Sequence, residues 1–173
     1  DRMKRVSSEF GPRKSPTTGA SSDHKGTDLT DKSGEGAPIY ALMGGTVEVV
    51  VDKFTAGINQ GSGYGNVVKI RDVRYGKNVE VRYGHLKRVY VAKGERVEAG
   101  VLVADEGTTG TSTGPHLHLE VIIDGQHINP AFFFDDETLK EWGAAAGADK
   151  REAFERKYIE ALQLRGSGIT LET

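Results

Sequence analysis

The sequence predicts a mainly β fold, an antiparallel β-sheet core followed by a C-terminal α-helical extension. Glycine accounts for 23 of the 173 residues, roughly twice the usual share of about 7%, and this excess indicates many tight turns between short strands. Between residues 37 and 134, apolar and polar residues alternate in short runs that glycines separate, which is typical of strands. From Asp149 onward the apolar residues recur at helical spacing instead.

The composition limits the chemistry that the chain can perform. It has no cysteine and 5 histidines, so any catalysis or metal binding must use histidines, carboxylates or hydroxyls rather than thiols. The net charge of -2 creates no global field that would attract nucleic acid or an anionic membrane. No apolar run approaches the roughly 20 residues that span a bilayer. We therefore expect neither a nucleic-acid partner nor membrane insertion.

The length suits one domain, which we divide into three segments. Residues 1–36 are expected to form an N-terminal loop segment with one short strand, residues 37–134 the β core, and residues 135–173 the helical extension. In this extension the sequence predicts a helix over Asp149–Leu164, whose apolar stripe is expected to pack on the sheet or on another part of a longer chain. The start at Asp1 also favours a piece of a larger protein.

The alternation predicts six strands in the core: Thr46–Val51, Val67–Val73, Val79–Tyr83, Val89–Val91, Val101–Val103 and Leu117–Ile123. The second and third strands flank a turn at Tyr75–Asn78 and are expected to form an antiparallel hairpin. The stretch Thr55–Gly65 contains four glycines and is expected to be a mobile loop. No Gly-Lys-Ser or Gly-Lys-Thr follows it, which argues against a nucleotide-binding loop.

The last predicted strand carries two histidines on one face. Alternation places His116, His118 and Glu120 on one side of the strand and the leucines between them on the other, so the leucine face is core and the histidine face lines a cleft. Two residues at i and i+2 have Cα atoms about 7 Å apart, given a rise of about 3.3 Å per residue. One imidazole can then bind a metal ion while the other reaches a water molecule or substrate on it.

A second set of donors lies in the sequence His24-Lys25-Gly26-Thr27-Asp28, where we expect Gly26 to let the backbone turn so that the two polar side chains converge. Catalytic zinc commonly has three protein ligands from imidazole and carboxylate groups and an open position for water. His24, Asp28 and one histidine of the His116/His118 pair make such a set. The remaining histidine of that pair and His85 would then be free for proton transfer.

Other polar residues near these motifs have alternative interpretations. Glu120 is either a partner of a ligand imidazole or a solvated carboxylate on the strand. Tyr64 and Tyr83 are interpreted as packing residues rather than catalytic ones. His127 is expected to lie in a turn with only a structural role.

Several motifs, taken together and in order, resemble the lysostaphin/LytM-like zinc endopeptidases, which cut the peptide part of bacterial peptidoglycan. They cover roughly residues 10–133: FGPR (10–13), HKGTD (24–28), GYGNVV (63–68), YGHL (83–86), VAKGERV (91–97) with Gly100, GTTGTSTGPHLHLE (107–120) and Asn129-Pro130. The helix expected from Asp149 lies outside the resemblance.

The resemblance implies a barrel-sandwich type of sheet with long loops that form a groove. It also implies Zn²⁺ as cofactor, held by His24, Asp28 and His118, with His85 and His116 as the catalytic pair. Residues 1–36 would then carry the first zinc motif. Because no implied ligand is missing, we expect an active enzyme.

The function that we expect is hydrolysis of peptide cross-links or stem peptides in bacterial peptidoglycan, by metal-assisted amide cleavage. Such a lysin would be extracellular, periplasmic or virion-associated, from a bacteriophage or a bacterial autolysin. Its partners would be peptidoglycan peptides and the rest of a longer chain or a virion assembly. The alternatives are a catalytically silent cell-wall-binding module with the same fold and a biotin- or lipoyl-type carrier. The carrier is disfavoured because neither Met3 nor Met43 flanks a suitable acceptor lysine, and the absence of HExxH excludes a helix-based metalloprotease.

Overall fold

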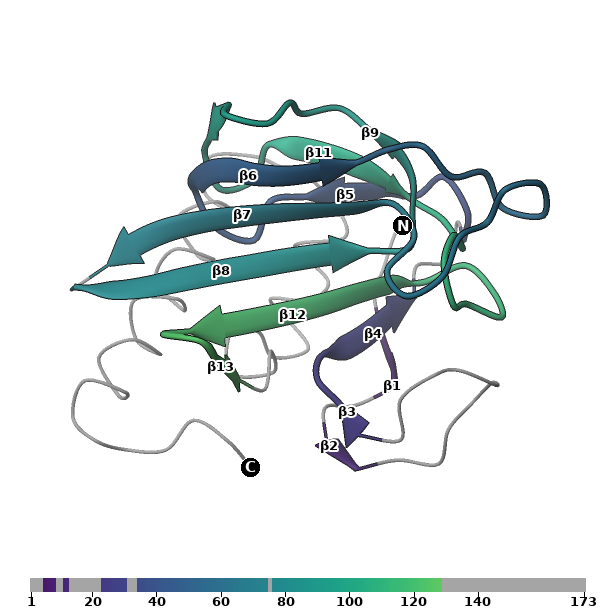
Figure 1. Ribbon diagram of the computed structural model, residues 1–173, viewed down its shortest axis with the longest axis horizontal. Coiled ribbons are helices and arrows are strands. Elements are labelled where there is room, and N and C mark those ends of the chain that lie inside the picture. Colours follow the sequence, from purple (N-terminus) through teal and green to yellow (C-terminus); the bar gives the residue numbers. More distant parts are fainter. Residues whose placement is uncertain (1–4, 9–10, 13–22, 31–33, 75, 129–173) are drawn as a thin grey trace.

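The computed structural model describes residues 5–8, 11–12, 23–30, 34–74 and 76–128, with side chains described from Lys25 onward except at Arg74. Within these ranges every regular element is a strand, and together they form one large antiparallel sheet and two small ones (Figure 1). The prediction of a mainly β antiparallel fold is confirmed. The expected helix at Asp149–Leu164 and the motif Asn129-Pro130 lie outside the described residues.

The large sheet has eight strands. In spatial order they are β1 (Arg5–Ser8), β4 (Thr27–Thr30), β12 (Leu117–Ile123), β8 (Lys77–Gly84), β7 (Val67–Arg74), β6 (Gly45–Val51) and β10 (Arg96–Val97), with β13 (Gln126–Ile128) beside β12. The three-stranded sheet has the order β5 (Pro38–Tyr40), β11 (Leu102–Glu106) and β9 (Leu86–Val89). The remaining pair is β2 (Gly11–Pro12) with β3 (Asp23–His24).

Alternation along the strands creates the core. On β8 the side chains of Val79, Val81 and Tyr83 are buried, whereas the intervening Glu80 and Arg82 are partly exposed. Because successive side chains point to opposite faces, one face of β8 packs inward and the other carries polar groups. The core cluster joins this face to the three-stranded sheet, which lies near β6 in Figure 1.

Two strands share one edge of β12. On that edge β4 pairs with Leu117–Leu119 and β13 pairs with Val121–Ile123, so Glu120 lies between the two pairings. The opposite edge of β12 pairs with β8 from His118 to Ile123. This arrangement brings β4, β8 and β13 around the histidine-bearing strand.

The strand predictions are confirmed for the longer strands. Leu117–Ile123 matches at both ends, and the predicted hairpin is present, although β7 and β8 pair as far as Arg74 opposite Lys77. The turn is therefore shorter than Tyr75–Asn78. The prediction of a strand at Val89–Val91 is wrong, because the strand is Leu86–Val89.

Residues 1–36 contain more strand than the one expected. Four short strands lie in the described part of this segment, and β4 is an integral member of the large sheet between β1 and β12. Runs of two to four residues are too short for alternation to identify, because their pairing partners lie far away in the sequence.

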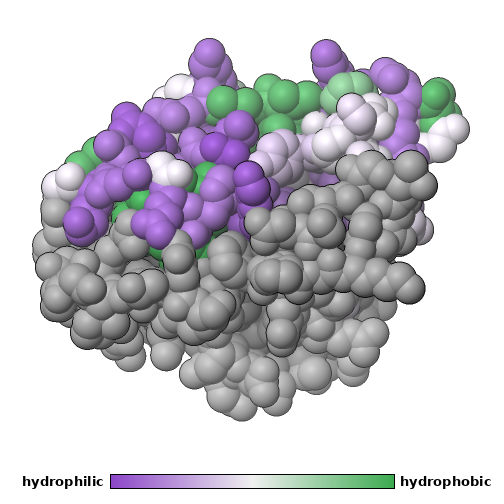
Figure 2. Space-filling model, turned by 60° about the horizontal axis from the view of Figure 1, so that its bottom comes forward, coloured by the Kyte–Doolittle hydropathy of each residue, from purple (hydrophilic) through white to green (hydrophobic). Residues whose placement is uncertain are grey.

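The described surface offers no large apolar area on the face that Figure 2 shows. Hydrophilic residues predominate there, and apolar residues form small separate patches. No helix among the described residues is long and apolar enough to cross a membrane.

Candidate functional site

Strand register brings one aspartate and three histidines together. His118 on β12 lies opposite Asp28 on β4 and, across its other edge, opposite Gly84 on β8. His85 directly follows β8, and His116 directly precedes β12. The order of three neighbouring strands therefore determines this convergence, although the residues span more than half of the sequence.

Asp28 lies at the centre of the group. Its Oδ1 atom is 2.9 Å from Nδ1 of His118 and 3.7 Å from Nε2 of His116. Asp28 is 9% exposed, so the carboxylate and the imidazoles face one another in a largely desolvated place. Because a carboxylate oxygen only accepts, the contact at 2.9 Å requires a proton or a cation between Asp28 and His118.

Backbone carbonyls orient the other two imidazoles. Nδ1 of His85 lies 2.6 Å from the carbonyl oxygen of Thr109, and Nδ1 of His116 lies 2.8 Å from that of Gly114. Because a carbonyl only accepts, each Nδ1 carries the hydrogen and each neutral ring keeps its lone pair on Nε2. The two ring centroids are 4.6 Å apart, so both rings can act on one reacting group.

His85 occupies a strained and buried position. Its φ is 62°, in the left-handed region that few non-glycine residues adopt, and its backbone N–H donates to the carbonyl of Tyr64 at 2.7 Å. Burial, followed by the proximity of His116 and His118, lowers the pKa of His85 to about 4. The imidazole is therefore neutral at physiological pH.

Glu120 is a partner of His118 rather than a solvated carboxylate. It is only 3% exposed, and its Oε2 atom accepts a hydrogen bond from Nε2 of His118 at 2.7 Å. Burial alone would raise the pKa of Glu120, but the hydrogen bond and charge of His118 outweigh it and lower the pKa to about 2. Burial likewise opposes the charge of His118, but the bonds to Asp28 and Glu120 raise its pKa to about 9.

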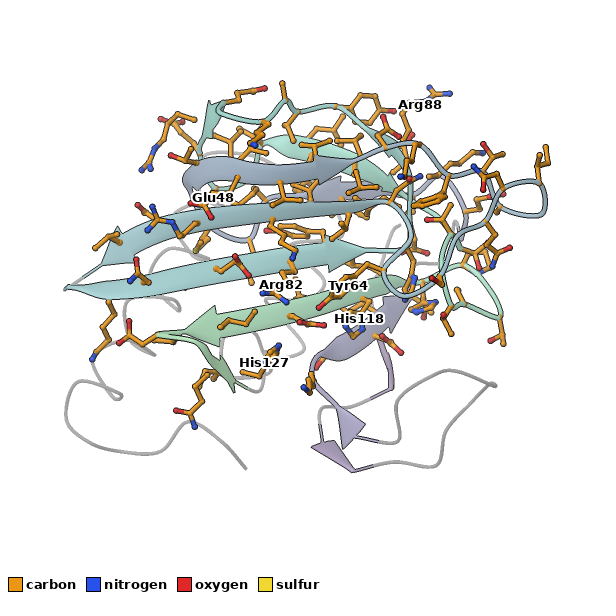
Figure 3. All side chains as sticks on the ribbon, viewed as in Figure 1. Glu48, Tyr64, Arg82, Arg88, His118 and His127 are labelled. Carbon is orange, nitrogen blue, oxygen red and sulfur yellow. The ribbon has the colours of Figure 1, made fainter. Side chains whose placement is uncertain are left out.

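Two residues that the sequence interpretation left out of the site also contact Glu120. The hydroxyl of Tyr64 lies 2.9 Å from both carboxylate oxygens, and Nε2 of His127 lies 3.0 Å from Oε1. Tyr64 is thus more than a packing residue. The expectation that His127 lies in a turn is wrong, since it lies on β13. Figure 3 shows Tyr64, His118 and His127 gathered beside β12.

Gly26 is needed for close approach rather than for a turn. A Cβ atom at this position would lie 2.3 Å from the carbonyl oxygen of Leu119 and 2.8 Å from Cγ of Glu120. No left-handed φ is found at Gly26. The residue therefore lets the strand of Asp28 lie directly against β12, which differs from the backbone turn that the sequence interpretation assigned to it.

The donor set fits a zinc ion. Carboxylate oxygen and imidazole nitrogen are ordinary zinc ligands. Asp28 Oδ1 and His118 Nδ1 lie 2.9 Å apart, and a zinc ion that binds both would replace the proton between them. Among the described side chains no group of three such donors is already arranged around a metal position. His24, the remaining expected ligand, is the last residue of β3, and two residues separate it from β4. Its side chain is outside the described part.

The chain is similar to a known protein family and to several curated proteins. Residues 22–130 match the model of Peptidase family M23. Among curated relatives, the chain is 41% identical to the peptidoglycan DD-endopeptidase ShyC of Vibrio cholerae, over 74% of this chain and 27% of that protein. It is 39% identical to the DD-carboxypeptidase/endopeptidase Mpg of Neisseria meningitidis, over 96% of this chain and 35% of that protein. The chain thus spans about a quarter to a third of these relatives.

Solved structures share the fold. The catalytic domain of lysostaphin from Staphylococcus simulans superposes with a TM-score of 0.59 at 25% identity, over 73% of this chain and 88% of that one. A zinc containing peptidase from Vibrio cholerae gives a TM-score of 0.58 at 33% identity, over 73% and 36% of the two chains. With its family match covering more than half of its length, the chain belongs to peptidase family M23.

Proposed function

We propose that the chain is a zinc-dependent endopeptidase that hydrolyses peptide bonds of bacterial peptidoglycan. The observation that carries this proposal is the convergence of Asp28, His118, His116 and His85 at the junction of β4, β8 and β12. In the proposal His24, Asp28 and His118 hold the zinc ion, and His85 and His116 are the catalytic pair.

The chemistry divides between the metal and the histidines. A bound zinc ion would polarise the scissile carbonyl and lower the pKa of water towards about 7. His85 and His116 each keep a free Nε2 lone pair because Nδ1 donates to a backbone carbonyl. One of them takes the proton of the attacking water on Nε2 and passes it to the leaving amine. The other, in the form that carries a hydrogen on Nε2 as well, would donate to the carbonyl oxygen on which charge develops.

The relatives support a substrate class and a location. ShyC is named as a peptidoglycan DD-endopeptidase and Mpg as a DD-carboxypeptidase/endopeptidase. We propose endopeptidase cleavage of peptidoglycan cross-links for this chain. Peptidoglycan lies outside the cytoplasmic membrane, so the enzyme would act in the periplasm or extracellularly. These curated relatives come from bacteria, which favours a bacterial cell-wall enzyme over a virion component.

The test is digestion of purified peptidoglycan. We expect the protein to release soluble muropeptides with new amino groups, and we expect both a chelator and the His118→Ala substitution to abolish this release. Mass spectrometry of the products would identify the bond that is cut. A folded, zinc-loaded protein that releases nothing would instead indicate a catalytically silent binding module, and digestion that the chelator leaves unchanged would contradict zinc dependence.

A further inference from the structure

A second group of polar side chains lies beside the candidate ligands, and the proposed reaction leaves it without a role. It consists of Glu120 with Tyr64, Arg82 and His127, which we name the Glu120 cluster. Its members come from β12, the loop before β7, β8 and β13. Figure 3 shows the three labelled members of this cluster close to His118.

The contacts of the cluster engage both oxygens of the carboxylate. Oε2 accepts from His118, Oε1 accepts from Nε2 of His127 at 3.0 Å, and the Tyr64 hydroxyl lies 2.9 Å from each oxygen. Nη1 of Arg82 lies 3.6 Å from Oε1 and donates to the Tyr64 hydroxyl at 3.1 Å. A carboxylate held from several directions cannot rotate freely, so its acceptor position towards His118 is set.

The backbone around Glu120 adds to this restraint. Glu120 lies on β12 between the residues paired with β4 and those paired with β13. Gly26 passes so close that a Cβ atom there would lie 2.8 Å from Cγ of Glu120. The backbone at Gly26 therefore confines the aliphatic part of the Glu120 side chain on the side that faces β4.

The direction of the His118 hydrogen bond has a consequence for metal binding. An ionised carboxylate only accepts, so Nε2 of His118 carries the hydrogen that Glu120 receives. Without a metal ion, Nδ1 also carries a hydrogen, because it lies 2.9 Å from the carboxylate oxygen Oδ1 of Asp28. When this proton is lost, the lone pair lies on Nδ1, because Glu120 keeps the hydrogen on Nε2. A ligand imidazole whose other nitrogen donates to a carboxylate is held in one tautomer and orientation and becomes more basic.

We propose that Glu120 is a positioning residue that directs Nδ1 of His118 towards the zinc ion, and that His127 holds Glu120 in place for this task. This inference rests on one part of the proposed function, the binding of zinc by Asp28 and His118. It does not require that the protein hydrolyses peptidoglycan. Arg82 and Tyr64 complete the support of the carboxylate from the β8 side.

The test measures zinc affinity by competition with a chromophoric chelator. We expect Glu120→Gln to raise the dissociation constant about 10- to 100-fold. The Co²⁺-loaded form of this variant should also show a changed visible absorption spectrum. Glu48→Gln is the matched control, because Glu48 lies on β6 of the same sheet and pairs with Arg71 instead of a member of the cluster. This control should leave the dissociation constant unchanged.

A pair of variants at His127 covers the case in which Glu120→Gln fails to fold. His127→Leu removes the donor to Oε1 and should weaken zinc binding, whereas His127→Gln keeps an N–H donor and should restore most of the affinity. Equal zinc affinity in wild type, Glu120→Gln and His127→Leu would overturn the proposal, as would a wild-type protein that binds no zinc. A wild type that binds zinc but does not digest peptidoglycan would contradict only the proposed function.

Discussion

At the residue scale, the site depends on where each imidazole keeps its hydrogen. The carbonyls of Thr109 and Gly114 hold Nδ1–H of His85 and His116, whereas Glu120 holds Nε2–H of His118. With these hydrogens in place, the neutral form of His85 or His116 presents the lone pair of Nε2. His118 presents the lone pair of Nδ1 once the proton that Nδ1 donates to Asp28 is lost. This difference separates the proposed proton-transfer pair from the proposed ligand.

The buried state of His85 makes a pH-dependent prediction for the metal-free protein. The pKa of about 4 in the folded state lies below the unfolded value of about 6.5, so the unfolded chain binds more protons between these values. The contribution of His85 to stability is present above about pH 6.5 and is lost as the pH falls towards 4. Relative to His85→Gln, the wild type should lose about 2 kcal/mol more between pH 7 and pH 5.

Urea unfolding of both chelated proteins at the two pH values measures this difference. The carboxylates of Asp28 and Glu120 and the imidazole of His118 are present in both proteins. The effect of their own titration on stability therefore largely cancels in the comparison. Parallel loss of stability in wild type and variant would show that His85 is not kept neutral by burial.

At the element scale, the approach of β4 to β12 determines the site. Asp28 reaches His118 because the two are register partners, and Gly26 allows the approach. The sequence shows that a glycine stands between His24 and Asp28, but not which backbone it must accommodate. That information resides in the pairing of strands about 90 residues apart in the chain.

Gly26→Ala tests this close approach. The new methyl group would meet the carbonyl oxygen of Leu119 at 2.3 Å, and backbone cannot yield as a flexible side chain can. We expect a loss of about 1–3 kcal/mol in the free energy of unfolding and weaker zinc binding. Gly114→Ala is the stability control, since a Cβ atom there meets nothing within 4 Å. Equal stability of the two variants would disprove the role of Gly26.

At the scale of the whole molecule, the long strands and the histidine motifs were predictable because each is a local pattern. His116, His118 and Glu120 alternate with Leu117, Leu119 and Val121, so the two histidines are expected on one face of the extended chain. The burial of Glu120 was not predictable in this way, because it depends on β4, β8 and β13 meeting around β12. His127 escaped notice for the same reason, since its strand has only three residues.

The central claim is that the fold assembles one zinc site from segments that are distant in the sequence, and metal content tests it most directly. After dialysis against metal-free buffer, elemental analysis of the wild type should find one zinc ion per chain. Asp28→Asn should lose it, whereas Asp52→Asn, at an exposed aspartate, should retain it. A wild type without zinc, or an Asp28→Asn variant that keeps a full equivalent, would contradict the account.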